Sequence, residues 1–98
     1  MKLRILPEAL ARIDAARAWW IGNREKVPEL FDDELAAVLE QIATAPFAGQ
    51  RVSLSRGRGV RRALMQKSGF HVYYDVVEEE IHILTIWGAV RGSGPTLG

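Results

Sequence analysis

The chain has 98 residues, of which 48% are hydrophobic and 26% are charged, and its formal net charge is +1. This length allows one small hydrophobic core, so we expect a single domain over residues 1–98, and the composition excludes a disordered chain. The sequence has no cysteine and no apolar run of the roughly 18 residues that a membrane span needs, so a disulfide frame and a membrane helix are excluded and we expect a cytoplasmic protein.

The N-terminal part predicts a strand followed by a helix. Residues 2–6 alternate charged and apolar side chains, which is typical of a strand. Pro7 suits the first turn of a helix, because its φ is fixed and it lacks an amide hydrogen, and we expect this helix over 7–21. Three apolar side chains recur on one of its faces: Leu10, Ile13 and Trp20. Adjacent helical residues lie about 100° apart, so either Trp19 or Trp20 should be in the core and the other partly exposed.

A second helix is predicted from Pro28 to the Ala45-Pro46 break. Its apolar side chains recur at i, i+4, i+7, i+8 and i+11, the clearest amphipathic stripe of the chain: Phe31, Leu35, Val38, Leu39 and Ile42. Four acidic residues crowd its first two turns, where the helix dipole favours anions. No histidine lies among them, so we expect no metal site there. The short link between the two helices predicts an antiparallel helical hairpin.

Three runs rich in valine, isoleucine and aromatic residues follow between residues 60 and 91, and these residue types favour strands. Short polar segments at 67–69 and 78–80 separate the runs, so consecutive strands should pair as an antiparallel meander. Together with the first strand and the helices, this pattern predicts an α+β fold in which a helical hairpin packs on one face of an antiparallel sheet.

Strict alternation along these strands assigns side chains to two faces of the sheet. One set from the run 70–76 should meet the helices: Phe70, Val72, Tyr74 and Val76. The other set should lie on the open face, beside Arg61 or Arg62 of the neighbouring strand: His71, Tyr73 and Asp75. In the last strand, Ile81, Ile83 and Thr85 should oppose His82, Leu84 and Ile86. An uncovered, partly apolar face of this kind indicates a partner surface.

Basic residues are segregated along the chain. All twelve acidic residues lie at or before Glu40 or at or after Asp75. Six basic residues lie between them: Arg51, Arg56, Arg58, Arg61, Arg62 and Lys67. The irregular segment 46–59 carries half of this block. The block is either a solvated loop and strand edge or a docking surface for an acidic protein segment or for nucleic acid.

Five segments carry a resemblance to a known family. They are Pro7-Glu8-Ala9, Ala45-Pro46-Phe47, and the segments 59–62, 69–76 and 83–92, which read GVRR, GFHVYYDV and ILTIWGAVRG. Their order and spacing resemble the RelE/ParE superfamily of bacterial type II toxins over nearly the whole chain. The resemblance implies a β-α-α-β-β-β fold with a twisted antiparallel sheet. It also implies a toxin that a cognate antitoxin neutralises by wrapping it with an extended or helical C-terminal segment.

The superfamily has two branches with different mechanisms. RelE-like members cleave mRNA on the ribosome and carry basic residues on the meander strands. Here Gln66 stands at a position that is often basic, His71 replaces an arginine, and no tyrosine or histidine follows His82. ParE-like members inhibit DNA gyrase, have no catalytic triad of their own, and resemble the chain better in helix length and in the Trp-Gly-Ala-x-Arg pattern that ends at Arg91.

The resemblance therefore favours a ParE-like gyrase inhibitor that arrests growth. Two alternatives stay open: a RelE-like, ribosome-dependent mRNA endoribonuclease, and an inactive member retained as a binding module. The expected partners are the antitoxin and DNA gyrase, or the ribosome and mRNA in the nuclease alternative. No cofactor is expected in any of these cases.

Two sets of site residues follow from these alternatives. In a nuclease, His71 would act as the base and Arg61 or Arg91 would hold the phosphate, with Tyr73 beside them. In a binding protein, arginines would meet antitoxin carboxylates, because bidentate arginine pairs are strong. The predicted partner-binding residues are Arg58, Arg61, Arg62, His71, Tyr73, Trp87 and Arg91.

Overall fold

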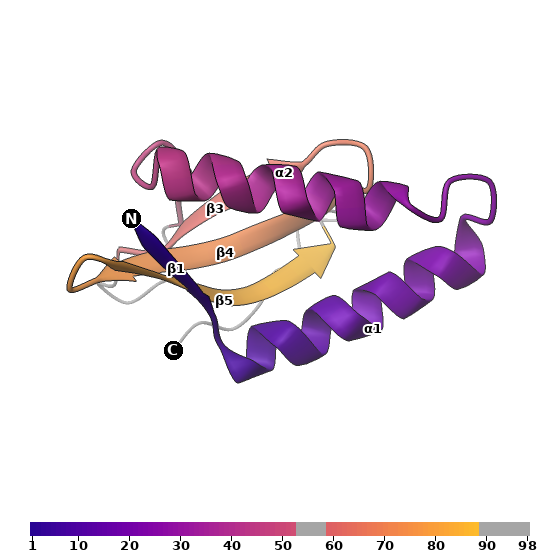
Figure 1. Ribbon diagram of the computed structural model, residues 1–98, viewed down its shortest axis with the longest axis horizontal. Coiled ribbons are helices and arrows are strands. Elements are labelled where there is room, and N and C mark those ends of the chain that lie inside the picture. Colours follow the sequence, from indigo (N-terminus) through magenta and orange to yellow (C-terminus); the bar gives the residue numbers. More distant parts are fainter. Residues whose placement is uncertain (53–58, 89–98) are drawn as a thin grey trace.

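The computed structural model describes residues 1–52 and 59–88 (Figure 1). Its elements follow the order β1 (Lys2–Ile5), α1 (Pro7–Asn23), α2 (Leu30–Thr44), β2 (Gln50–Arg51), β3 (Arg61–Met65), β4 (Phe70–Val77) and β5 (Glu80–Gly88). The two helices run in opposite directions, as the short link predicts. Residues from both helices and from the sheet belong to one core cluster, so the helical hairpin covers one face of the sheet and the α+β prediction is confirmed.

The sheet has the order β1-β5-β4-β3-β2, and it is mixed rather than fully antiparallel. The meander β3–β4–β5 is antiparallel as predicted, whereas β1 pairs parallel with β5. Parallel pairing is possible here because the whole helical hairpin lies between β1 and the meander and carries the chain back across the sheet. Alternation of side chains does not encode strand direction. The short strand β2 lies inside the segment that we expected to be irregular.

The helix α1 begins at Pro7 as expected and extends two residues past the predicted end, to Asn23. Its buried face includes Ala9, Ile13 and Trp20. Leu10 lies beside this face and is 51% exposed. The prediction of Leu10 in the core was therefore wrong. The prediction for the tryptophan pair is confirmed, because Trp20 is 4% exposed and Trp19 is 50% exposed. The Trp20 Nε1 donates to the Val27 carbonyl at 2.8 Å.

The helix α2 begins at Leu30, two residues after Pro28, and ends before the predicted Ala45-Pro46 break. Its apolar stripe is confirmed, since Phe31, Leu35, Val38 and Ile42 are all buried and Leu39 is partly buried against them. An ion pair joins the helices, with 2.7 Å between Arg17 Nε and Asp32 Oδ1.

A β-bulge in β5 changes which residues face the helices. Tyr73 pairs with Thr85 and Tyr74 pairs with Ile83, so Leu84 is an extra residue between the two pairs. A single inserted residue moves every following side chain to the other face. Thr85 therefore lies beside Tyr73 on the face away from the helices, and Ile86 joins the core with Val72. The strict alternation predicted for this strand was wrong beyond Ile83.

Glu34 fastens α2 to the turn between β3 and β4. Its two carboxylate oxygens accept hydrogen bonds from the backbone amides of Lys67 and Ser68, at 2.8 and 2.7 Å. Partial burial alone would raise the pKa of Glu34, but these amides stabilise the anion and hold the pKa below its usual value.

We expect Glu34→Gln to lower the free energy of unfolding by about 1–2 kcal/mol at neutral pH, because an amide cannot accept both bonds. A carboxylate with a depressed folded pKa stabilises above its unfolded pKa of about 4.3 and loses that contribution as pH falls through the folded value. The difference between the two proteins should therefore shrink in acid. Urea unfolding at several pH values measures it, with the exposed neighbour Asp33→Asn as the control; equal losses for both variants would contradict the assignment.

Candidate functional site

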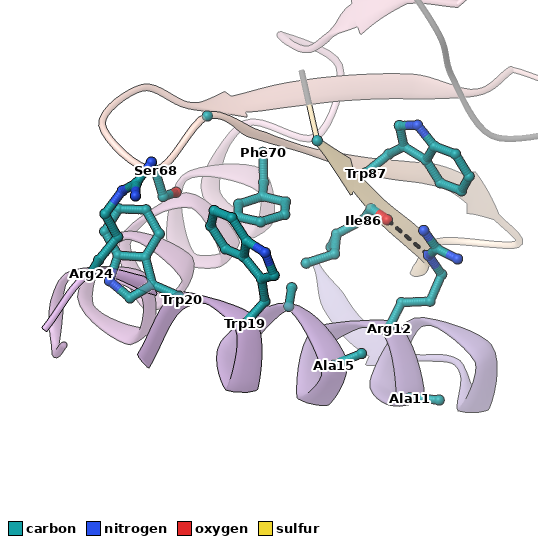
Figure 2. Close-up of a pocket in the computed structure, with 13 residues that line it drawn as sticks. Ala11, Arg12, Ala15, Trp19, Trp20, Arg24, Ser68, Phe70, Ile86 and Trp87 are labelled. Atoms are coloured by element: carbon teal, nitrogen blue, oxygen red, sulfur yellow. Dashed lines mark hydrogen bonds between the residues drawn. The ribbon is translucent and has the colours of Figure 1, made fainter. Parts of the chain in front are cut away.

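A groove of about 600 Å³ lies between α1 and the adjoining ends of β4 and β5 (Figure 2). Small side chains of α1 leave the space open, among them Ala11 and Ala15. Aromatic side chains border it, namely Trp19, Trp20, Phe70 and Trp87. A concave surface with an apolar lining and a few polar groups is the usual composition of a binding site.

Two arginines stand at the two ends of this groove. The guanidinium of Arg12 lies 4.1 Å from the centre of the Trp87 ring, and its Nε donates to the Ile86 carbonyl at 3.2 Å. The guanidinium of Arg24 lies over Trp19 at 5.4 Å. Neither arginine forms an ion pair within the described part of the chain. Twelve helical positions separate them, roughly 18 Å along the axis, so two cations bracket an aromatic surface.

The Arg12 contact also covers an open strand edge. β1 pairs only with the first half of β5, from Glu80 to Ile83. Beyond it, Trp87 and Ile86 leave the strand on opposite sides, and Arg12 reaches the Ile86 carbonyl from α1 (Figure 2). On the edge away from β4, the second half of β5 therefore meets the Arg12 side chain and no other strand of the described residues.

The face of the sheet away from the helices carries most of the predicted partner-binding residues that the structure describes. In the register, Arg62 is opposite Tyr73 and His71 is opposite Trp87. These four residues lie on three neighbouring strands, β3, β4 and β5.

This face is less open than we expected. Tyr73 is 3% exposed and Asp75 is 4% exposed, so the prediction that both lie on an open surface was wrong. Tyr73 is on the central strand, with Arg62 and Thr85 on either side and the His71 ring 6.1 Å away along the strand. His71 is only partly buried. Burial, with a smaller effect from the Arg62 charge, lowers the pKa of His71 and so favours its neutral imidazole.

Arg61 lies apart from this group. It is opposite Tyr74, whose side chain belongs to the core on the helix side of the sheet. Its Nη1 donates to the Gly49 carbonyl at 2.8 Å, and its guanidinium lies 5.7 Å from the centre of the Phe47 ring. Arg61 and His71 are therefore on opposite faces of the sheet. Arg58 and Arg91, which complete the predicted sets, lie outside the described residues.

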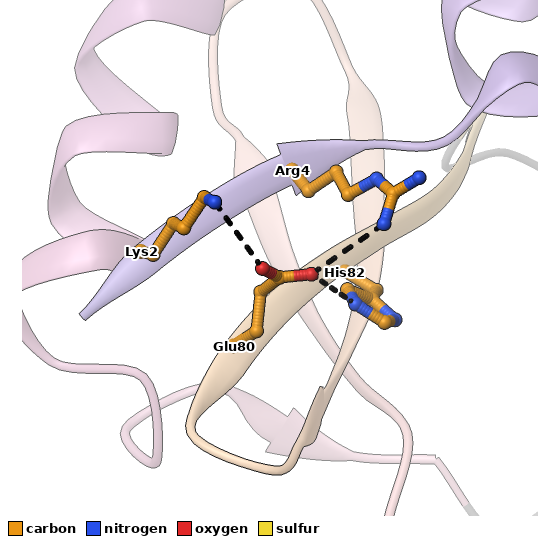
Figure 3. A network of polar contacts seen from close by, with 4 residues as sticks. All are labelled: Lys2, Arg4, Glu80 and His82. Carbon is orange, nitrogen blue, oxygen red and sulfur yellow. Dashed lines mark hydrogen bonds and ion pairs between the residues drawn. The ribbon is translucent and has the colours of Figure 1, made fainter.

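A polar network joins β1 to β5 at the other end of the sheet (Figure 3). The Glu80 carboxylate lies 3.7 Å from Lys2 Nζ, 3.8 Å from Arg4 Nη1 and 2.7 Å from His82 Nε2. The His82 hydrogen bond is the main cause of the lowered pKa of Glu80. His82 is thus a partly buried hydrogen-bond partner of Glu80.

No group of three or more histidine, aspartate or glutamate side chains within residues 1–52 and 59–88 is placed to hold a metal ion. Across the same residues, no helix is long and apolar enough to cross a membrane.

The groove was not predicted from the sequence. Arg12, Arg24 and Trp19 line it, and none of them is among the site residues predicted from the sequence. The available signal is the alanine-rich face of α1 beside an exposed tryptophan. It becomes a groove only when β5 lies opposite that face.

Comparison with known proteins gives a structural match of high coverage. No family model matches the sequence, and no curated protein matches it. Among solved structures, the chain is similar to a chain described as "Chromosomal ParDE TA system from P. aeruginosa", with a TM-score of 0.63 and 26% sequence identity. The match covers 88% of this chain and 92% of that chain, so the two share one fold over almost their full length.

Proposed function

The chain has the fold of the ParE-like toxins of the RelE/ParE superfamily, and from this premise we propose that it is the toxin of a type II toxin–antitoxin pair that inhibits DNA gyrase. The observation that carries the proposal is the structural similarity to a ParDE system along almost the whole of both chains. The toxin acts in the cytoplasm, where gyrase works, and a cognate antitoxin holds it inactive until it is released.

The groove along α1 is the proposed antitoxin contact. Its aromatic border offers apolar burial, and Arg12 and Arg24 offer charge without a paired acid in the described chain. An antitoxin segment that fits this groove therefore carries two carboxylates roughly 18 Å apart, with apolar side chains between them. A helix spans that distance in about three turns. Trp87, one of the residues predicted from the sequence, lies at the Arg12 end.

The arrangement of the described residues favours inhibition by binding over RNA cleavage. Cleavage needs a base and a phosphate-binding cation on one surface. Arg61, the described arginine of the predicted nuclease set, lies on the face of the sheet opposite to His71, and Tyr73 is buried. Arg62 shares the face of His71, but its Nε already donates to Gln50. A gyrase inhibitor needs no such catalytic set.

Expression of the chain alone in a bacterial host tests the proposal. We expect growth arrest, accumulation of cleaved DNA and intact mRNA, and we expect co-expression of the cognate antitoxin to restore growth. With purified gyrase, the chain should increase the amount of linear DNA recovered from a supercoiled plasmid.

Two other results would contradict this function. Cleavage of mRNA with normal plasmid supercoiling would establish the RelE-like alternative, and His71→Ala should then abolish the cleavage. If cells grow normally while they contain a verified amount of folded protein, the chain is neither type of toxin, and the inactive binding module is the remaining alternative. Lys26→Gln, an exposed change outside the groove, is the matched control and should behave as the unmodified chain does.

A further inference from the structure

Two arginines of like charge lie directly opposite each other at one edge of the sheet. Arg51 of β2 pairs with Arg61 of β3, so both side chains project to the same face. Arg61 is opposite Tyr74, which belongs to the core beneath the helices, so this is the helix face. Directly opposite residues have Cβ atoms about 5 Å apart, and like charges at that spacing destabilise a sheet. The pair therefore costs stability unless an anion lies between the two guanidiniums.

The surrounding residues orient these charges without compensating them. Arg61 Nη1 donates to the Gly49 carbonyl, which is a neutral acceptor, and the Arg61 guanidinium lies beside the Phe47 ring. Arg51 is exposed. No carboxylate of the described segments 1–52 and 59–88 forms an ion pair with either arginine. An anionic ligand could therefore bind both guanidiniums without first displacing an acid of these segments.

The path of the chain into β2 gives this edge a fixed shape and an apolar side. The Ala48 amide donates to the Ala45 carbonyl at 3.1 Å and closes a turn just beyond the C-terminal end of α2. This turn presents Phe47, which is 60% exposed. Gly49 then lies so close to the Tyr74 hydroxyl that a side chain on Gly49 would overlap it. The exposed ring is thus held beside the arginine pair.

Arg51, Arg61 and Phe47 form what we call the arginine corner, and we propose that it binds an acidic segment of a partner protein. A carboxylate between the arginines can accept from both guanidiniums, and such charge-assisted hydrogen bonds are strong. An apolar side chain next to that carboxylate can cover Phe47. β2 is the last strand in the order of the sheet, so an extended segment can also lie along its outer edge.

A protein segment fits the arginine corner better than a nucleic acid does. A nucleic acid needs cations along a row of phosphates, whereas Arg62, the next residue of β3, projects to the other face. Two guanidiniums beside an exposed phenyl ring match one or two carboxylates next to an apolar residue. The strands β3 and β4 separate this corner from β5 and the groove beside it. The inference therefore adds a second contact and does not depend on the proposed function.

NMR titration of the isotope-labelled chain tests the inference residue by residue. The probe is a synthetic peptide of alternating glutamate and leucine, and it should shift the amide signals of Gly49, Gln50 and Arg51 as it saturates. The double variant Arg51→Gln, Arg61→Gln should bind the peptide about tenfold more weakly at these signals. Replacing the leucines of the peptide with serine should lower its affinity for the unmodified chain but not for Phe47→Ala.

The matched control removes two positive charges elsewhere, at the exposed residues Lys26 and Lys67, each changed to glutamine. If this control weakens peptide binding as much as the double variant does, only net charge matters and the inference is overturned. Shifts confined to the groove, at Ala15 and Gly88, would overturn it too. So would an oligonucleotide that shifts the amides of the arginine corner with equal or higher affinity, because the corner would then not select a protein segment.

A single change keeps the test decisive if the double variant does not fold. The Arg51 side chain is exposed and makes no hydrogen bond among the described residues, so Arg51→Gln should fold normally and bind the peptide about threefold more weakly. Because it relieves the repulsion from Arg61, it should also raise the urea midpoint of the free chain, and more so at low salt. An unchanged peptide affinity or a lower midpoint would refute the inference.

Discussion

Replacing Phe31 with alanine should lower the free energy of unfolding by about 3–5 kcal/mol, as is usual for a buried phenylalanine. Phe31 has no exposed surface, and its ring packs edge-on against Phe70 with 5.4 Å between ring centres. A domain of this size has a total stability of roughly 5–15 kcal/mol, so the change removes a large part of it. The urea concentration at the unfolding midpoint measures the loss.

The chain offers a control of the same residue type. Phe47 is 60% exposed, and its described ring contact is with the Arg61 guanidinium. Phe47→Ala should therefore change stability by no more than about 1 kcal/mol. Similar losses at both positions would show that the core is not centred on the contact between α2 and β4. Phe70 also lines the groove, so the Phe31 variant should also lower the affinity of any ligand that binds there.

Replacing Trp19 with alanine should weaken binding of the cognate antitoxin about 30-fold, which corresponds to about 2 kcal/mol. Trp19 lines the groove, is 50% exposed, and lies beneath the Arg24 guanidinium. Exposed aromatic side chains of this kind contribute strongly to binding once a partner covers them, whereas they add little to the stability of the free chain. Calorimetric titration of the antitoxin measures the affinity, and thermal unfolding checks that stability is kept.

Leu10 supplies the matched control for this change. It lies on the same helix, is 51% exposed, and does not line the groove. Leu10→Ala should bind the antitoxin as the unmodified chain does. If Trp19→Ala also binds normally, the antitoxin does not use the groove, and the predicted residues of the opposite sheet face become the place to look.

Much of the fold could be predicted because the information is local. The stripe from Phe31 to Ile42 repeats with a helical period, and Pro7 and the Ala45-Pro46 break mark helix boundaries. The polar segment at 67–69 lies in the first turn of the meander, and residues 78 and 79 form the second, directly before β5 begins at Glu80. The stripe of α1 was less clear, because its buried face includes alanine as well as larger residues, and this is why Leu10 was assigned wrongly.

The candidate site could be predicted only in part. The sequence predicts Arg61, Arg62, His71 and Trp87 as partner-binding residues, but it does not show how they divide between the two faces of the sheet. The division follows from the pairing of Arg61 with Tyr74 and of Arg62 with Tyr73. The position of Trp87 depends further on the bulge at Leu84.

By itself, the sequence determined the number and type of the main elements, the helical hairpin, the antiparallel meander and a block of basic residues free of acids. These properties depend on residues that are near one another in the chain. Only the tertiary structure decided the parallel pairing of β1, the bulge in β5 and the groove beside α1. It also decided that Arg61 and Arg62 lie on opposite faces of the sheet, with Arg61 on the helix side. Each of these features depends on which distant segments pair and in what register they pair. Hydrophobic periodicity specifies neither the pairing nor the register.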